Sequence, residues 1–497
     1  MKKLIREERS VGKLILLIGI LLAVPLLVLP FYPSERHYAV SFLIPSVFSI
    51  LLGIGIGLFP KKAPQKADFR EHLYSSSLTV LCAWGYGILA GAVPFVIAKR
   101  LTPVQALFEA VSGWTTTGLS VMDVAQESNI FLFHRSFMQF CGGLGFVMMM
   151  IVFVQEKESM NLYSAEGHPD RIMPSLKKTA RIILLMYLGF LFAGILLLSG
   201  AGMPLFDSIN HAMCALSTGG FSTRTESVGA YHSIPVETVT NLLMLIGATN
   251  FAVLVLLVQR KFKKVLAVSE VRFMLFLLAL AVPVVSLNLF SRYLEKTFLS
   301  GIRTALFNVI AALSTTGFST VSFGEWPSFS LGIMILLMLI GGGIGSTAGG
   351  LKLARVYIML RLSSESIKER ISSRRRISAP FYHNAQGKQP LDTALYKQTA
   401  SFATVYLLLF LLGSLLLTET ADCSLTEAMF EFSSALGTVG LSVGITNPSA
   451  NRATLLVEMA GMLLGRLEIY IVLIGFYSAF NRMRSLYRHF SHSSAIR

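Results

Sequence analysis

Thr116-Thr117-Gly118-Leu119-Ser120 is the first of four copies of the pattern Thr-X-Gly-(Leu/Phe)-Ser in this chain of 497 residues. The other copies occupy Thr218–Ser222, Thr315–Ser319 and Thr438–Ser442. Each copy follows a short, mostly apolar segment and precedes a long hydrophobic one, which predicts a fourfold repeat of helix, re-entrant loop and helix. One polypeptide of this kind can close a ring of four loops around a pore.

The composition of the chain is that of a membrane protein. Of its residues, 53% are hydrophobic and only 14% are charged, whereas roughly a quarter of the residues in an average soluble domain are charged. The soluble globular class is therefore excluded, and the length allows about ten spans of roughly 20 residues each. The four cysteines lie in or next to apolar stretches without paired spacing, so we interpret them as packing residues rather than a disulfide or metal site.

Hydropathy predicts ten spans. They lie near residues 14–30, 39–59, 74–98, 131–154, 180–200, 236–258, 266–290, 328–360, 398–418 and 453–480. The first is long for a signal peptide, lacks a small-residue cleavage site and is followed at once by a second span, so we expect it in the mature protein. An even number of spans places both termini on the same side of the membrane.

The basic residues predict which side that is. Of the 43 Lys and Arg residues, 33 fall in the two termini and in the loops near 59–73, 155–181, 259–272 and 352–397. Cytoplasmic loops carry an excess of Lys and Arg, so we expect both termini in the cytoplasm. The formal net charge of +16 is then mainly a topology signal, and no nucleic-acid partner is expected.

These features divide the chain into six segments. A transmembrane hairpin without a pore loop, 1–66, precedes three repeats at 67–165, 166–262 and 263–362. A basic hydrophilic insert, 363–397, follows, and 398–497 holds the fourth repeat and the C-terminal tail. We interpret the insert as a cytoplasmic loop that fixes topology; an anionic-lipid or regulatory site is the alternative.

The four loops have the composition expected of a filter for a monovalent cation. A cation that leaves water must recover oxygen ligands, and rings of backbone carbonyls can supply them. Such carbonyls require non-helical backbone, which Gly permits without obstructing the path. The aligned segments are small or hydroxylated and uncharged: Thr115-Thr116-Thr117-Gly118, Ser217-Thr218-Gly219-Gly220, Ser314-Thr315-Thr316-Gly317 and Gly437-Thr438-Val439-Gly440. A calcium site would be expected to carry carboxylates, and for a single copy a helix C-cap or packing contact would be the simpler interpretation.

A helix-like segment of about a dozen residues precedes each loop and begins near Pro103, Pro204, Gly301 and Ser424. A dozen residues make roughly 18 Å of helix, too short to span, so each segment is expected to enter the membrane and turn back. Its C-terminal end would direct negative partial charge toward the ion path. Four ionisable residues in these segments are expected to hydrogen-bond locally and hold the loops in place, rather than attract cations: Glu109, Asp207, His211 and Glu431.

The eighth predicted span is interrupted by six glycines in ten residues. They lie in Gly341-Gly342-Gly343-Ile344-Gly345-Ser346-Thr347-Ala348-Gly349-Gly350. Each glycine in a helix costs about 1 kcal/mol relative to Ala, so the helix should break in the membrane and form a flexible loop beneath the filter. We interpret this loop as a mobile gate; close helix packing through small residues is the alternative.

Arg466 is a basic residue placed within the last predicted span. A charge at membrane depth is costly and normally faces a partner or a water-filled cavity. We expect it to face the pore as an electrostatic barrier. The alternative is that its side chain snorkels to the cytoplasmic interface.

Together, the four loops, the Gly341–Gly350 break, Leu351-Lys352-Leu353-Ala354-Arg355 and Gly465-Arg466-Leu467-Glu468 resemble the Trk/Ktr/HKT superfamily of potassium transporters. The leading hairpin and the length are most similar to the membrane subunit of the bacterial Trk system, the TrkH and TrkG branch. The resemblance implies a potassium-translocating homodimer in the cell inner membrane, with one pore per subunit and ions held by the Thr-X-Gly loops. It further implies a gate at the broken third-repeat helix and a cytoplasmic TrkA-like regulatory subunit that binds the nucleotide. No cofactor is expected on this chain itself, and Gly118 at the first filter position favours potassium over sodium.

Other functions remain as alternatives. A Ktr-like transporter coupled to sodium or protons would share the loops. A secondary transporter with broken helices would carry its interruptions in paired halves with midplane ionisable residues, which four loop motifs fit poorly. A membrane-embedded enzyme would need a nucleophile and base or a metal cluster, and the nine histidines form no such motif.

Overall fold

The computed structural model describes residues 4–57, 69–145, 176–292, 297–372, 380–391, 393–467 and 469–480. They form two compact units. The first takes in the described parts of 1–100, 145–182 and 467–497, and the second those of 101–144 and 183–466. All the predicted filter and gate residues belong to the second unit.

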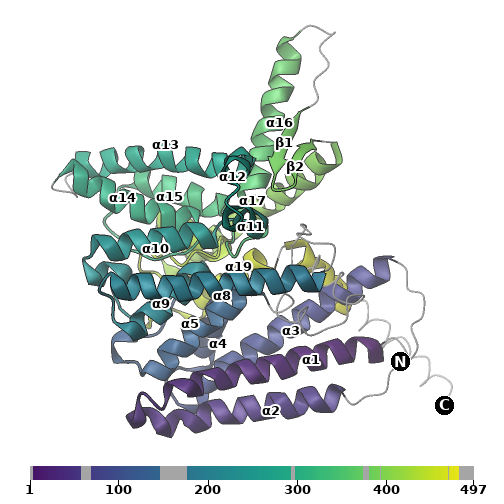
Figure 1. Ribbon diagram of the computed structural model, residues 1–497, viewed down its shortest axis with the longest axis vertical. Coiled ribbons are helices and arrows are strands. Elements are labelled where there is room, and N and C mark those ends of the chain that lie inside the picture. Colours follow the sequence, from purple (N-terminus) through teal and green to yellow (C-terminus); the bar gives the residue numbers. More distant parts are fainter. Residues whose placement is uncertain are drawn as a thin grey trace. The chain divides into compact units, whose positions relative to one another are not determined.

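A close helical hairpin begins the first unit. The hairpin consists of α1 (Leu4–Ala23), the 3-10 turns Val24–Val28 and Pro33–Tyr38, and α2 (Ala39–Gly57). The helix α3 (Phe69–Ile97) follows it in the same unit. α1 and α2 run side by side (Figure 1). Small residues permit the approach: a Cβ on Gly53 would lie 2.6 Å from the Leu16 nitrogen, and the Ser46 hydroxyl donates a 2.7 Å hydrogen bond to the Gly19 carbonyl.

Four short helices organise the second unit. They are α4 (Pro103–Trp114), α9 (Leu205–Leu216), α14 (Phe298–Leu313) and α18 (Leu425–Leu436). Local capping fixes where they begin; at α4, for example, Thr102 and Gln105 form a capping box. Three begin within one residue of the predicted start. α14 begins earlier than the predicted Gly301 because Thr297 and Ser300 form a capping box there.

Further helices are α5 (Asn129–Leu144), α8 (Leu176–Gly200), α10 (Ile234–Gly247), α11 (Phe251–Val258), α12 (Phe262–Ala267), α13 (Ser269–Ser291), α15 (Ser328–Ile340), α16 (Leu353–Ile371), α17 (Thr393–Ala421) and α19 (Arg452–Arg466). One more helix, Ile469–Phe480, belongs to the first unit. Short 3-10 turns lie at Val124–Gln126 and Ser227–Tyr231. Among the described residues, six helices are long and apolar enough to cross a membrane, or up to eight if each bent pair is one span. This is fewer than the ten predicted. α15 is a shorter apolar helix, and the predicted span 131–154 continues past α5 into residues outside those described.

The predicted span 236–258 is two helices rather than one. α10 and α11 are bent by 116° at residues 248–250. The Asn250 side chain accepts a hydrogen bond from the Ala252 N–H and caps α11, which starts a new helix in a new direction. The sequence analysis placed a break only in the third repeat, so the second repeat requires this correction.

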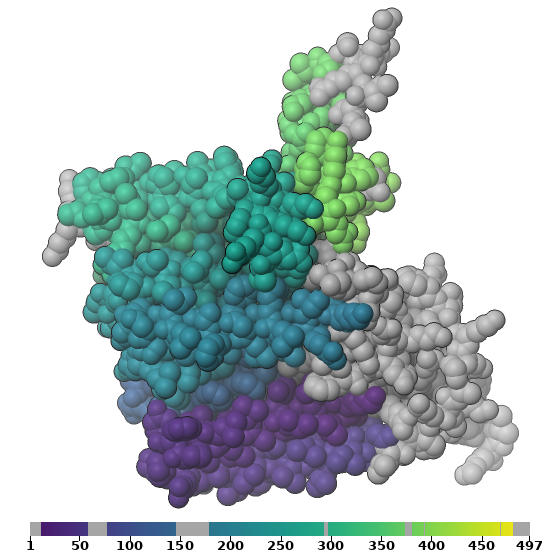
Figure 2. Space-filling view, in the orientation of Figure 1, coloured from purple at the N-terminus to yellow at the C-terminus, as the bar shows by residue number. Residues whose placement is uncertain are grey.

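The insert at 363–397 contains regular structure where it is described. α16 continues to Ile371, and β1 (Phe381–Asn384) pairs antiparallel with β2 (Gly387–Pro390). This hairpin departs from the all-α prediction. α16 and the hairpin project from the rest of the second unit (Figure 1, Figure 2). The basic run 374–376 lies outside the described residues.

Candidate functional site

Each short helix ends in the same backbone motif, with a threonine in its left-handed position. After α4, the Thr116 N–H donates to the Gly113 carbonyl and the Thr117 N–H to the Ser112 carbonyl, the pattern of a Schellman cap. The left-handed residues are Thr116 (φ +56°), Thr218 (+52°), Thr315 (+54°) and Thr438 (+50°). A β-branched residue rarely adopts this conformation, which costs on the order of 1–3 kcal/mol. The motif is thus a helix C-cap in all four copies, and its strain is repeated four times.

The glycine that follows touches the next loop, and these contacts form a closed cycle. A Cβ on Gly118 would overlap the Gly219 carbonyl oxygen. The other contacts join Gly220 to the Thr316 carbonyl, Gly317 to the Val439 carbonyl and Gly440 to the Thr117 carbonyl. All four glycines have positive φ, from +74° to +100°. Both the conformation and the close approach require glycine. The structure therefore brings the four predicted loops together, and places four backbone carbonyls at the joints between them.

A polar side chain nine residues before each glycine braces the returning loop. The pairs are Glu109 with the Ser120 hydroxyl (2.6 Å), His211 with the Ser222 hydroxyl (3.0 Å), Asn308 with the Thr320 hydroxyl (3.0 Å) and Glu431 with the Ser442 hydroxyl (2.6 Å). Asp207 accepts hydrogen bonds from Arg224 at 2.8 Å and from the Tyr231 hydroxyl at 2.8 Å. Burial and this carboxylate raise the pKa of Tyr231 to about 12, so the phenol remains a donor at neutral pH. These contacts confirm the interpretation that Glu109, Asp207, His211 and Glu431 hold the loops locally.

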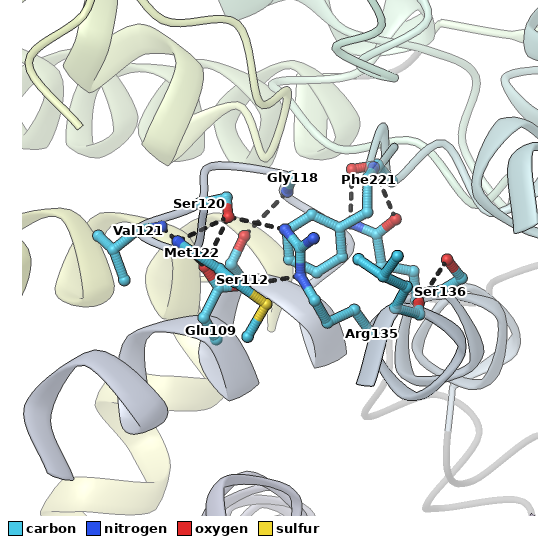
Figure 3. Close-up of polar contacts among 12 residues, drawn as sticks. Glu109, Ser112, Gly118, Ser120, Val121, Met122, Arg135, Ser136 and Phe221 are labelled. Carbon is cyan, nitrogen blue, oxygen red and sulfur yellow. Dashed lines mark hydrogen bonds and ion pairs between the residues drawn. The ribbon is translucent and has the colours of Figure 1, made fainter. Parts of the chain in front are cut away.

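A buried ion pair ties the first two loops together (Figure 3). Arg135 Nε of α5 lies 3.0 Å from Glu109 Oε2, and the two side chains are 2% and 0% exposed. Glu109 also accepts hydrogen bonds from two backbone N–H groups of the first loop. The Arg135 guanidinium donates to the Ser120 hydroxyl at 2.7 Å and lies 4.0 Å from the centre of the Phe221 ring. Because Ser120 belongs to the first loop and Phe221 to the second, one cation holds both.

The Gly-rich segment 341–350 is a loop held in the bend between α10 and α11. The Gly343 N–H donates to the Ala248 carbonyl at 2.9 Å, and the Phe251 N–H donates to the Gly345 carbonyl at 3.0 Å. The predicted break of the third-repeat helix is confirmed, since α15 ends before this segment and α16 begins after it. The two broken helices of the second and third repeats thus contact each other through backbone hydrogen bonds.

The same loop reaches the left-handed threonines. Thr347 Oγ1 lies 3.2 Å from Thr218 Oγ1, and the Gly349 N–H donates a 2.8 Å hydrogen bond to Thr315 Oγ1. A Cβ on Gly349 would overlap the Thr438 hydroxyl. The Gly-rich loop therefore contacts three of the four left-handed threonines.

Two threonine hydroxyls in this ring have no hydrogen-bond partner among the residues that the structure describes. They are those of Thr116 and Thr438, both fully buried. Buried polar atoms are normally satisfied, and hydroxyl oxygens can coordinate a monovalent cation. The described part of the chain has no group of three or more His, Cys, Asp and Glu side chains able to hold a metal ion. The candidate ion ligands at this site are accordingly carbonyl and hydroxyl oxygens.

Arg466, the last residue of α19, also binds the Gly-rich loop. Its guanidinium donates to the Thr347 carbonyl at 2.6 Å and to the Gly142 and Gly143 carbonyls at 2.6 and 3.2 Å. The latter two lie at the C-terminal end of α5, where carbonyls lack intrahelical partners. These contacts direct the side chain to protein backbone, in contrast to the snorkelling alternative. The neighbouring residue 468 lies outside the described residues.

Several residues of this site were missed by the sequence analysis. Arg135 and Gln139 are four residues apart on α5 and both are buried. Two polar residues at helical spacing within a predicted span indicate a shared buried face, which was the available signal. Asn308 could have been found from its alignment with the other braces, nine residues before the glycine of its loop.

Comparison with known proteins gives consistent matches over nearly the whole chain. The family model TrkH, described as a cation transport protein, matches residues 61–483. The Trk system potassium uptake protein TrkH of Salmonella typhimurium is 28% identical, over 95% of this chain and 98% of the relative. TrkG of Escherichia coli, also named a Trk system potassium uptake protein, is 30% identical, over 95% of this chain and 97% of the relative. The crystal structure of the potassium transporter TrkH from Vibrio parahaemolyticus has a TM-score of 0.81 at 26% identity, and the match covers 94% of this chain and 97% of that one.

Proposed function

The chain belongs to the TrkH family of cation transport proteins, and we propose that it takes up potassium ions across the cell membrane through one central pore. The relatives are named for potassium uptake by the Trk system. At least six described helices have the length and apolar character to cross a membrane. A multi-pass protein of the bacterial inner membrane fits both observations.

The selectivity filter is assigned to the four Thr-X-Gly loops. The observation that carries this assignment is the closed cycle in which the glycine of each loop abuts a carbonyl of the next. An ion at the centre of the cycle would meet oxygens from all four loops, chiefly the carbonyls of Thr117, Gly219, Thr316 and Val439. The hydroxyls of the left-handed threonines supply a further set of oxygens, and the ends of the four short helices add negative partial charge.

The repeated parts support a pseudo-fourfold arrangement of helix, pore loop and helix. Each repeat has a short helix, a Schellman cap with threonine, a glycine at the joint and a brace nine residues before it. The equivalence of these four parts is what a pore lined by one chain needs, because each repeat then presents the same backbone to the ion.

The gate is assigned to the Gly-rich loop and Arg466. The loop residues with this role are Gly341, Gly342, Gly343, Gly345, Ser346, Thr347, Gly349 and Gly350. The contacts of Thr347 and Gly349 with the left-handed threonines support a position directly against the filter. A fixed positive charge about 5 Å from a passing cation repels it by on the order of 3 kcal/mol at an effective dielectric constant near 20. Arg466 would add this barrier to the obstruction by the loop.

Regulation is assigned to a cytoplasmic nucleotide-binding subunit of the TrkA type, acting on a homodimer with one pore per subunit. The positive charge of the basic loops and both termini favours a position on the cytoplasmic face. α16 begins at Leu353, just after the Gly-rich loop, and projects from its unit (Figure 1). A partner that holds α16 could therefore move the loop between discrete positions. Anionic lipids are the other partners suited to the basic loops.

Rubidium uptake into proteoliposomes tests the proposal. Uptake should be inhibited by potassium far more than by sodium, and it should depend on the nucleotide-binding partner. Reversal potentials measured while the potassium and proton gradients are varied independently separate a potassium pathway from a sodium- or proton-coupled transporter. Equal inhibition by potassium and sodium would contradict the proposed filter, and flux unaffected by partner and nucleotide would contradict the proposed regulation.

A further inference from the structure

The second loop lacks a side chain that the other three possess. The residue before the filter glycine is Thr117 in the first loop, Thr316 in the third and Val439 in the fourth, but Gly219 in the second. In the first loop the Thr117 hydroxyl lies 2.8 Å from that of Thr115. In the third loop the Thr316 hydroxyl makes the same 2.8 Å contact with Ser314. The second loop keeps Ser217 at the corresponding position, but the residue two positions later is Gly219 and carries no hydroxyl.

Gln139 of α5 occupies the space that this missing side chain leaves. A Cβ on Gly219 would overlap the Gln139 amide. The amide Nε2 donates a 2.6 Å hydrogen bond to the Gly219 carbonyl, and Oε1 accepts a 3.0 Å hydrogen bond from the Phe221 N–H. The side chain is fully buried. These two bonds fix the orientation of the amide, because a carbonyl needs a donor and an N–H needs an acceptor.

The two bonds enclose the filter glycine of the second loop. Gly220 lies between Gly219 and Phe221, so Gln139 holds the backbone on both sides of it. The Gly219 carbonyl is also the one that abuts Gly118 of the first loop. Gln139 thus acts on a joint between two loops, and the corresponding carbonyls of Thr117, Thr316 and Val439 have no such donor among the described side-chain contacts.

We propose that Gln139 is a positioning residue that sets the ion selectivity of the filter through the Gly219 carbonyl. The inference rests on the proposed function, since it requires that the four loops form the filter. An amide N–H on a carbonyl draws off part of its negative charge and limits its movement. A carbonyl held in this way cannot close around a smaller ion, and it presents a weaker field to it. Both effects favour potassium over sodium.

A double-mutant cycle between Gln139 and Gly219 tests the proposal. Gln139→Ala removes the bonds and leaves a space beside Gly219. Gly219→Thr alone places a side chain against the Gln139 amide. The two changes together give the second loop the sequence of the third, Ser-Thr-Thr-Gly, with a threonine hydroxyl opposite Ser217 as in the Ser314–Thr316 contact. Gly219 does not have positive φ, so its backbone accepts a threonine.

The measurement is the ratio of potassium to sodium in competition with rubidium uptake, at equal amounts of folded protein. Gln139→Ala is expected to lower the ratio by about three- to tenfold, the effect of losing about one hydrogen bond. Gly219→Thr should lower it as well, and the double variant should restore most of the loss. A purely structural role would reduce the amount of folded protein or the maximal uptake and leave the ratio unchanged.

Two reference variants complete the test. Phe137 lies two residues from Gln139 on α5 and therefore faces another side of the helix. The potassium-to-sodium ratio of the Phe137→Leu variant should stay at the wild-type value. Gly118→Ser perturbs the ring directly. If Gly118→Ser changes the ratio while Gln139→Ala does not, the inference about Gln139 is wrong and the filter assignment stands. If none of the variants changes it, the filter assignment itself is wrong. A double variant no better than the worse single variant would also overturn the inference.

Discussion

The guanidinium of Arg466 donates a 2.6 Å hydrogen bond to the carbonyl of Thr347. The hydroxyl of Thr347 in turn donates a 2.9 Å hydrogen bond to the carbonyl of Leu216 at the end of α9. Thr347 therefore connects α19 of the fourth repeat with α9, the short helix of the second. Through this residue, the Gly-rich loop is held against the end of α9, where the second Thr-X-Gly loop begins. A change at either end of the connection should loosen the loop.

Arg466→Ala should raise basal potassium flux in the absence of the regulatory partner. The substitution removes both the positive charge and the three carbonyl contacts that hold the loop. Arg466→Lys keeps the charge and should largely preserve the barrier. Rubidium uptake into vesicles at equal protein is the measurement. Unchanged or lower flux from a folded Arg466→Ala protein would show that this residue is not part of the barrier.

Gly349→Ala should raise basal flux by displacing the loop. A Cβ at this position would overlap the Thr438 hydroxyl and the Gly437 carbonyl, and the carbonyl cannot move without disturbing the backbone of the fourth Thr-X-Gly loop. Gly332→Ala in α15 is the control, because a Cβ at this position would have no neighbour within 4 Å and Gly332 lies outside the Gly-rich loop. The account predicts higher flux for Gly349→Ala alone. Equal flux from both variants would show that contact of the loop with Thr438 does not restrict conduction.

Gly118→Ser should lower the preference for potassium over sodium without unfolding the protein. The serine would have to adopt φ near +100° and press on the Gly219 carbonyl, which reshapes the ring. Competition of potassium and sodium with rubidium uptake gives the ratio. A well-folded Gly118→Ser protein with the wild-type ratio would count heavily against this loop as part of the filter.

Arg135→Ala should destabilise the protein far more than Arg303→Ala. The first leaves the fully buried Glu109 carboxylate without its cation, which costs about 3–5 kcal/mol. Arg303 pairs with the buried Glu237 at 2.6 Å but is itself 42% exposed, so water can replace part of its interaction and its loss should cost less than that of Arg135. The midpoints of thermal unfolding in detergent provide the comparison. Similar midpoints for the two variants would contradict the structural importance assigned to the Glu109–Arg135 pair.

Features with a local cause could be predicted from the sequence. The short helices and their loops were found because capping residues and glycines act within a few residues of themselves. The Gly-rich break was found because so many glycines cannot sustain a helix. In the second repeat, the apolar run through 236–258 hides the bend at Asn250, since one capping side chain gives little hydropathy signal.

Features that depend on contacts between distant segments could not be predicted in this way. Gln139 binds Gly219, eighty residues further along the chain, and only the folded structure shows that it fills the space beside this glycine. The contacts of Arg466 with Thr347 and Gly142 are of the same kind. The sequence indicated that such a buried charge needs a partner, but it did not indicate that backbone carbonyls would provide it.

The most direct test of the central claim is the position of rubidium in crystals of this protein, located by its anomalous scattering. The account predicts a rubidium peak within the ring of loops, in contact with the carbonyl oxygens of Thr117, Gly219, Thr316 and Val439, that weakens when potassium is added and persists when sodium is added. A ring that stays empty while rubidium binds elsewhere in the protein would contradict the assignment of the filter.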